Sequence, residues 1–330
     1  MRNIWLDGIM GLVVGDALGV PVQFLYREEI KARPQGPVMG MESGGVYNMP
    51  EGTWSDDSSM ALATLDSIRE KGEIDPGDIM IRFALWELKG KYTPFGEAFD
   101  EGNTCSTAIY DFIKNPNIDT CGATGERSNG NGSLMRILPA CLYYYERQKK
   151  VCTSEDEAIF GIHKVSGLTH NHLRSKMCCG FYYFMVKSVI DGTSGMGNED
   201  AELIDLLQQG IDEAVKYYRR DLFNMTEMAR LGKLFYLNDF KTVPEDEIKT
   251  TGYVIDTIEA AVWCLITTDS YKECMLKAVN LGDDTDTVAA IAGGLAGLYY
   301  GYEEIPEDWL GVIKRREWIE EMLIDTMRSL

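Results

Sequence analysis

Two acidic clusters lie near opposite ends of this 330-residue chain, and each one precedes an apolar run with helical character. The first is Ser-Asp-Asp at residues 55–57, followed by the apolar residues 60–65. The second is Asp-Asp-Thr-Asp-Thr at residues 283–287, followed by the small-residue run 288–296. Neighbouring carboxylates repel one another unless a positive charge lies between them, and Mg²⁺ and Mn²⁺ prefer carboxylate and hydroxyl oxygens. We therefore predict that both clusters meet around a dinuclear metal site.

Helix capping is the alternative interpretation of each cluster. Ser and Asp are common N-cap residues, and carboxylates in a first turn interact favourably with the helix dipole. Either cluster alone fits capping as well as metal binding, but two clusters with neighbouring hydroxyls favour a metal site. A shared site requires both ends of the chain to lie together. We therefore expect residues 1–330 to form a single compact domain, although the length alone suggests about two.

Helical patterns follow one another along the chain, and we find no convincing strand alternation between them. The predicted helices cover residues 3–20, 57–70, 76–90, 104–113, 133–147, 200–220, 252–267, 270–280, 287–302 and 314–329, and residues 177–190 are a long apolar stretch. Residues 21–54 are rich in Gly and Pro and predict a long loop, and residues 191–200 predict a linker. Long loops in compact domains are often functional, and this one leads into the first acidic cluster. The pattern predicts an all-α fold.

The composition limits the class of partner. A formal charge of −20 should repel nucleic acids and anionic membranes. The longest uncharged stretch, residues 287–302, is Gly-rich and shorter than the roughly 20 residues of a membrane span. The eight cysteines include no CxxC pair or zinc-site spacing, and no secretory signal is evident. We therefore expect reduced thiols and a cytoplasmic location.

Three further features contain candidate site residues. Asp16 is a lone acid in an apolar run, and it either satisfies buried groups or belongs to a site. Residues 122–133 are rich in Gly and Asn and could hold a phosphate, but they lack the Lys-Ser/Thr ending of a P-loop, so a simple turn is the stronger interpretation. His163, His170 and His172 share one window. The spacing of the last two predicts a cap or loop, from which one histidine could face a cleft.

Six motifs occur in a fixed order along the chain. They are Gly-Asp-Ala-Leu-Gly-Val-Pro at 15–21, Trp-Ser-Asp-Asp at 54–57, Gly-Asn-Thr at 102–104, Gly-Asn-Gly-Ser-Leu-Met-Arg at 130–136, Thr-His at 169–170 and Gly-Asp-Asp-Thr-Asp-Thr at 282–287. Together they resemble the ADP-ribosylglycohydrolase family over about residues 8–301. Each motif is modest alone, whereas the ordered set is highly specific. The resemblance implies an orthogonal all-α domain with two Mg²⁺ or Mn²⁺ ions in a cleft.

The resemblance also implies roles for individual residues. The metal ligands would be Ser55, Asp56, Asp57, Asp284, Asp286 and Thr287. Asp283 occupies a position that is often Gly, so we do not assign it as a ligand. Asp100 would be the general base, because it lies outside the metal clusters and can remain a free carboxylate. The substrate-binding residues would be Asn103, Gly130, Asn131, Gly132, Ser133 and His170.

Gln23 departs from the family pattern, because many relatives carry Glu there. Gln cannot deprotonate, so either Asp100 supplies the base or the activity is altered. The expected function is metal-dependent hydrolysis of the bond between ADP-ribose and a protein side chain, with arginine favoured over serine as the acceptor. The partner would be an ADP-ribosylated protein or a small molecule containing ADP-ribose. Two alternatives stay open: a relative that binds ADP-ribose without cleaving it, and a dinuclear phosphoester hydrolase.

Overall fold

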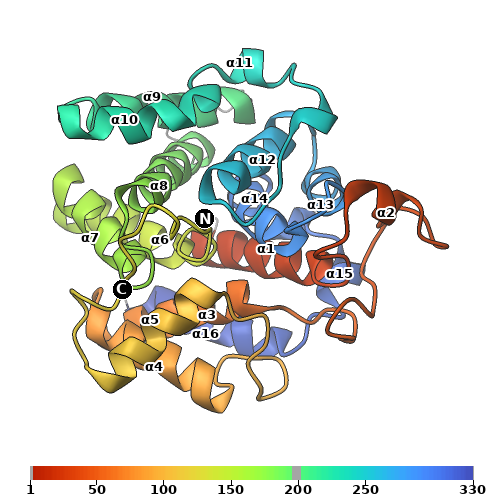
Figure 1. The fold of residues 1–330 in the computed structure, drawn as a ribbon, viewed down its shortest axis with the longest axis horizontal. Helices are drawn as coiled ribbons and strands as arrows, with labels where there is room; N and C mark the ends of the chain where they lie inside the picture. The colour runs from red at the N-terminus through yellow and green to blue at the C-terminus, as the bar shows by residue number, and fades with distance from the viewer. Residues whose placement is uncertain (1–2, 195–201, 330) are drawn as a thin grey trace.

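The computed structural model describes residues 3–194 and 202–329, and Figure 1 shows their arrangement. These residues form helices and isolated β-bridges but no strand, which confirms the all-α prediction. The α-helices are α1 Ile4–Gly19, α2 Arg27–Lys31, α3 Asp56–Lys71, α4 Pro76–Lys89, α5 Asn103–Lys114, α6 Leu138–Val151, α7 Glu155–Gly167, α8 Leu173–Thr193, α9 Leu203–Tyr218, α10 Met225–Met228, α11 Leu237–Phe240, α12 Val254–Ile266, α13 Tyr271–Asn280, α14 Thr285–Tyr300, α15 Glu307–Leu310 and α16 Arg316–Ser329. Short 3₁₀ turns cover 222–224, 229–235, 245–247 and 302–304.

Most predicted helices begin and end within a few residues of the observed ones. The clearest difference is α6, which begins at Leu138 rather than at 133, because Pro139 occupies the first turn, where a missing N–H is tolerated. Helix α7 was not predicted, although Ser154 and Glu157 form a capping box at its start. The predicted 191–200 linker overlaps the end of α8, and its residues 195–200 lie outside the described residues.

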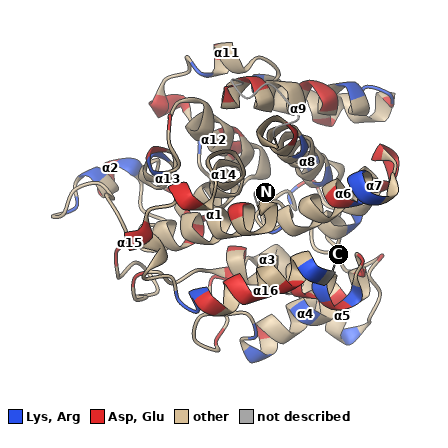
Figure 2. Ribbon diagram, turned by 180° about the vertical axis from the view of Figure 1, so that it is seen from behind, with Lys and Arg blue, Asp and Glu red and all other residues tan. Residues whose placement is uncertain are grey.

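Helices α1 and α14 lie side by side at the centre of the molecule (Figure 1). Helices α3, α4, α5 and α16 form the layer below α1 in this view, and α8, α9 and α10 lie above it. Every residue of α1 from Gly8 to Gly19 is buried, as expected of a helix that is apolar on all sides. Charged residues are concentrated on outer helices such as α4 and α16, while α14 is nearly uncharged (Figure 2). No described helix combines the length and the hydropathy that a bilayer span requires.

Small residues let the backbones of α1 and α14 approach closely. A Cβ atom added at Gly15 would overlap the Ala289 carbonyl group of α14. One turn further along α1, a Cβ atom at Gly19 would overlap the backbone of Asp286. The end of α1 therefore rests directly on the first turn of α14, which carries the second acidic cluster.

We expect Gly15→Ala to reduce the free energy of unfolding by about 1–3 kcal/mol, because the added methyl group forces the two central helices apart. Urea unfolding would measure the change. Gly232→Ala is the matched control, because a Cβ atom there meets nothing within 4 Å. A Gly15→Ala midpoint equal to that of the wild type would show that the close approach is not required for stability.

Candidate functional site

A cleft with a volume of about 370 Å³ opens where the first turns of α3, α5 and α14 come together near the end of α1. The described residues that line it are Gln23, Phe24, Tyr47, Asp56, Asp100, Glu101, Gly102, Asn103, Thr104, Cys105, Gly130, Asn131, Gly132, Met135, His170, Gly252, Asp284, Asp286 and Thr287. They contain five carboxylates and no Lys or Arg. The fold thus brings both acidic clusters to one cleft.

The first cluster begins α3. Ser55 is the N-cap residue, and its hydroxyl group donates to Asp57 Oδ2 at 3.0 Å. The Thr287 hydroxyl group lies 3.5 Å from the same oxygen, so the two clusters are in contact. Asp57 Oδ1 is buried and has no hydrogen-bond partner among the described residues. Asp56 lines the cleft from the same turn.

The second cluster begins α14. Asp284 is the N-cap residue, and its Oδ2 accepts a 2.7 Å hydrogen bond from Asn131. Asp286 Oδ1 accepts from the backbone N–H of Thr287 at 2.9 Å, whereas the buried Asp286 Oδ2 has no partner within the described chain. Asp283 adopts φ = +62°, a conformation that favours Gly. Asp283 therefore occupies a backbone position that suits Gly better than Asp.

The two clusters fit a divalent cation. Carboxylate oxygens of Asp16, Asp57 and Asp286 all lie within 4.8 Å of one another. Burial raises the pKa values of Asp56, Asp57 and Asp286 well above their usual range, and neighbouring carboxylates raise them further. Burial also raises the pKa of Asp284. A cation would relieve this repulsion and would satisfy the two oxygens that lack partners.

Asp16 connects α1 to the first cluster. Both of its carboxylate oxygens lie 3.0 Å from the backbone nitrogen of Ser55. Its Oδ2 also accepts from the backbone nitrogen and the hydroxyl group of Ser58, at 3.0 and 2.5 Å. The first N–H groups of a helix lack partners within the helix, so Asp16 caps α3 from a different helix. Burial raises the pKa of Asp16 to about 6, although the hydrogen bonds from Ser58 and Ser55 oppose the shift.

Asp100 and Asn103 lie at the start of α5, and both line the cleft. Asp100 has φ = +65°, and its Oδ1 accepts a 2.9 Å hydrogen bond from the Tyr47 hydroxyl group. The Tyr47 ring contacts the edge of Phe99 at a centroid distance of 5.2 Å. Burial and the nearby Asp100 carboxylate raise the pKa of Tyr47, so its hydroxyl group stays protonated and remains a donor. Tyr47 therefore orients one oxygen of Asp100 and leaves the other available.

Three of the four residues in the loop at 130–133 line the cleft. Gly130, Asn131 and Gly132 line it, and the Asn131 amide group donates to Asp284 and to Thr257. Ser133 is not among the described lining residues. Its hydroxyl group is fully buried, accepts from Ser166 at 3.0 Å and lies 3.7 Å from Cys179 Sγ. The side chain of Ser133 therefore points away from the cleft into the core, and the predicted substrate contact does not fit it. Its hydrogen bond with Ser166 holds the end of the loop in place.

His170 presents one ring nitrogen to the cleft. The buried Arg136 donates to the Thr169 hydroxyl oxygen at 2.8 Å, and this oxygen lies 2.8 Å from His170 Nδ1. Because Arg has no acceptor, the Thr169 proton can go to Nδ1, and Nε2 then carries the ring hydrogen. Nε2 would be 3.3 Å from a Cβ atom at Gly130, so it faces the glycine loop. Burial, with a smaller contribution from Arg136, lowers the pKa of His170 to about 3 and keeps the ring neutral.

The other two histidines have structural positions. His163 Nε2 lies 2.7 Å from the hydroxyl group of Tyr218 in the core. His172 is the N-cap residue of α8 and accepts from the backbone of Arg174 at 3.2 Å. The predicted cap near these histidines is therefore confirmed.

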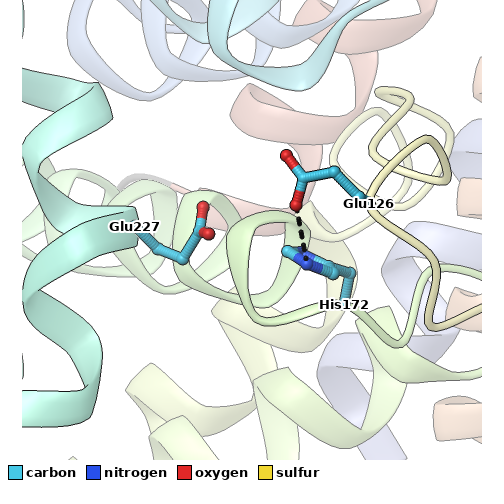
Figure 3. A group of neighbouring side chains, drawn as sticks. All are labelled: Glu126, His172 and Glu227. Carbon is cyan, nitrogen blue, oxygen red and sulfur yellow. Dashed lines mark ion pairs between the residues drawn. The ribbon is translucent and has the colours of Figure 1, made fainter.

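Two carboxylates outside the cleft, Glu126 and Glu227, lie around His172. Figure 3 shows Glu126, His172 and Glu227 converging from different segments, with ligand atoms within 4.8 Å of one another. Arg174 already pairs with Glu126 and Glu227 at 2.7 Å, and Arg230 approaches both. These guanidinium groups neutralise the carboxylates, so this cluster does not require a metal ion.

The prediction from sequence missed several lining residues. Tyr47 lies in the 21–54 loop, whose composition indicated a functional loop without singling out any residue. Phe24 and Cys105 also line the cleft, and no pattern in the sequence distinguishes them from core or surface residues. Arg136 was noted only as part of a helix and a motif. Its connection to His170 exists only in the folded chain.

We expect the ring-nitrogen chemical shifts of His170 in the wild type, measured by heteronuclear NMR, to show that Nε2 is protonated and Nδ1 is not. Thr169→Val keeps the shape but removes the hydroxyl group, so the two tautomers should mix and the free energy of unfolding should fall by about 1–3 kcal/mol. Thr242→Val, an exposed substitution, is the control. A protonated Nδ1 in the wild type would contradict the assignment.

Comparison with known proteins places these features in a family. The ADP-ribosylglycohydrolase family model matches residues 3–329. The chain is 30% identical to ADP-ribosylarginine hydrolase Tri1 of Serratia proteamaculans over 316 residues, which cover 95% of this chain and 76% of that protein. It is 32% identical to the ADP-ribosyl-[dinitrogen reductase] glycohydrolase of Rhodospirillum rubrum over 305 residues, covering 92% and 88% of the two chains.

A solved structure supports the same conclusion. A chain of an ADP-ribosylglycohydrolase-related protein complex superposes with a TM-score of 0.75 at 27% identity, covering 99% of this chain and 98% of that one. The match to the family model extends over nearly the whole chain, and the solved chain matches its helical fold over nearly its full length. The chain therefore belongs to the ADP-ribosylglycohydrolase family, whose enzymes hydrolyse linkages to ADP-ribose.

Proposed function

We propose that this enzyme hydrolyses the N-glycosidic bond between ADP-ribose and an arginine side chain of a modified protein, and that it requires a divalent metal. The observation that carries the proposal is the meeting of Asp57 and Asp286, from opposite ends of the chain, with unpartnered buried oxygens beside one cleft. The arginine linkage is supported by two relatives named ADP-ribosylarginine hydrolase, at 30% and 27% identity. Because both ends build this cleft, we also propose that residues 1–330 act as one domain.

The residues that would hold two Mg²⁺ or Mn²⁺ ions are Ser55, Asp56, Asp57, Asp284, Asp286 and Thr287. When bound, the ions would supply Lewis acidity, lower the pKa of a water molecule and compensate the carboxylate charge. Asp16 has a different task in this proposal, because four hydrogen-bond contacts already occupy its carboxylate group. It holds the start of α3, and with it Asp57, in place.

Asp100 is the general base of the proposed reaction. It lies at the cleft but outside both acidic clusters, and Tyr47 fixes one of its oxygens. The free oxygen can accept a proton from the attacking water. The arginine side chain departs with the electron pair of the broken C–N bond, which leaves positive charge on the ribose ring, as in other glycoside hydrolyses. The proton held by Asp100 can then return to the released guanidine group. The carboxylates around the cleft stabilise that charge, because they are already in position before the reaction.

Substrate binding is assigned to Asn103, Gly130, Asn131, Gly132 and His170. Gly130 and Gly132 leave room for a ligand to approach the loop backbone. The neutral His170 donates its Nε2 hydrogen toward the same loop. The substrate is an ADP-ribosylated protein or a small molecule that contains ADP-ribose. The eight cysteines are free thiols, which supports the proposal of a reducing, cytoplasmic location.

The first test is release of ADP-ribose from protein modified on arginine, measured with Mg²⁺, with Mn²⁺ and with EDTA. We expect release only with metal, and a loss of roughly 10²–10³-fold or more in the Asp284→Ala/Asp286→Ala variant. Asp283→Gly is the matched control, because it removes the neighbouring carboxylate and suits the local φ of +62°. Release that persists in EDTA would reject the metal requirement. Release from serine-linked but not arginine-linked protein would reject the arginine assignment.

The second test is Asp100→Asn. We expect kcat to fall roughly 10²–10⁴-fold, the usual contribution of a general base, with little change in KM. The Asn side chain can still accept the hydrogen bond from Tyr47, so the local structure should be kept. Glu97→Gln removes an exposed carboxylate nearby and should retain activity. Full kcat in Asp100→Asn would exclude Asp100 as the base.

A further inference from the structure

Gln23 has a buried donor group without a partner. It follows α1, lines the cleft and is only 3% exposed. Its backbone nitrogen donates to the Gly19 carbonyl group at 3.1 Å, which anchors the residue to the end of α1. Its side-chain Nε2 is buried and has no hydrogen-bond partner among the described residues. A buried amide group in this state is unfavourable unless something else occupies the site.

The surroundings place Gln23 at the acidic end of the cleft. The next residue, Phe24, donates its backbone N–H to the Asp283 carbonyl group at 2.7 Å. Gly19 lies against Asp286, and the Thr285 hydroxyl group donates to the Gly19 carbonyl group at 3.0 Å. The unpartnered amide group of Gln23 and the unpartnered oxygen of Asp286 are therefore on adjoining segments of the same cleft.

The chemistry of the amide group restricts what can satisfy it. The Nε2 group only donates hydrogen bonds, so neither a metal ion nor an arginine guanidinium group can be its partner. Its partner must be an acceptor atom with a free lone pair. In ADP-ribose such atoms are the ring nitrogens of adenine and the oxygens of the diphosphate group and of the riboses. The proposed base Asp100 lines the same cleft, which favours the reacting part of the substrate over the adenine. Beside so many carboxylates, a neutral hydroxyl oxygen is tolerated better than an anionic phosphate oxygen.

We propose that Gln23 binds the substrate, and that its side-chain amide group donates a hydrogen bond to an oxygen of the ribose that is linked to the acceptor. This inference rests on the proposed function and assigns a part of its substrate. A neutral side chain at this position has a direct consequence for specificity. A carboxylate at residue 23 could not donate this bond and would add another negative charge to the cleft.

The test is isothermal titration of two ligands, ADP-ribose and ADP, into wild type, Gln23→Met and Gln23→Glu in the presence of Mg²⁺. ADP lacks the ribose that Gln23 is proposed to bind. We expect both variants to bind ADP-ribose roughly tenfold more weakly, the scale of one buried hydrogen bond, and to bind ADP as the wild type does. Gln35→Met and Gln35→Glu, at an exposed position in the same loop, are the matched controls. Gln23→Met preserves the side-chain volume, and thermal unfolding would verify that both variants fold.

The outcomes separate this proposal from the proposed function. Unchanged affinity for ADP-ribose in both Gln23 variants would overturn the assignment and leave the proposed function intact. Equal weakening for ADP and ADP-ribose would also overturn it, because the partner oxygen would then lie in the ADP part. If the wild type failed to bind ADP-ribose at all, the proposed function would fail, and this assignment would fail with it.

Discussion

The close backbone approach of α1 and α14 is the contact on which the rest of this structure depends. The two helices come from opposite ends of the chain, and both are almost completely buried. Small residues at the contact, such as Gly15 against Ala289, remove the side chains that would hold the helices apart. The approach places the end of α1 on the first turn of α14. The cleft exists because these two helix ends meet.

The second constraint is electrostatic. The fold places Asp56, Asp57, Asp284 and Asp286 at the first turns of two helices, where backbone N–H groups and the helix dipole partly compensate their charge. Burial and repulsion between carboxylates nevertheless raise their pKa values. No Lys or Arg among the described lining residues opposes this shift. The divalent cation that we propose for this site would relieve the repulsion between these carboxylates. Capping and metal binding are therefore complementary interpretations of the same residues.

Neutral polar groups complete the cleft around the carboxylates. The amide group of Asn131 holds Asp284, the hydroxyl group of Tyr47 holds Asp100, and Thr169 connects the buried Arg136 to His170. In each case a hydrogen-bond donor orients a side chain that lines the cleft. Gln23 differs from these three, because its donor has no acceptor in the described protein. Asn131, Tyr47 and Thr169 therefore position other residues, whereas we propose that Gln23 binds the substrate directly.

The sequence by itself determined the all-α class, most helix positions and the family, because helical periodicity, capping residues and ordered motifs are local signals. It also identified both acidic clusters. Only the tertiary structure decided that Asp16 caps α3, that Ser133 lies behind the loop and that Tyr47 reaches Asp100. Each of these contacts joins residues at least 30 positions apart or depends on which side of a loop a side chain occupies. Such contacts are set by how buried helices pack, and no pattern along the chain records that packing.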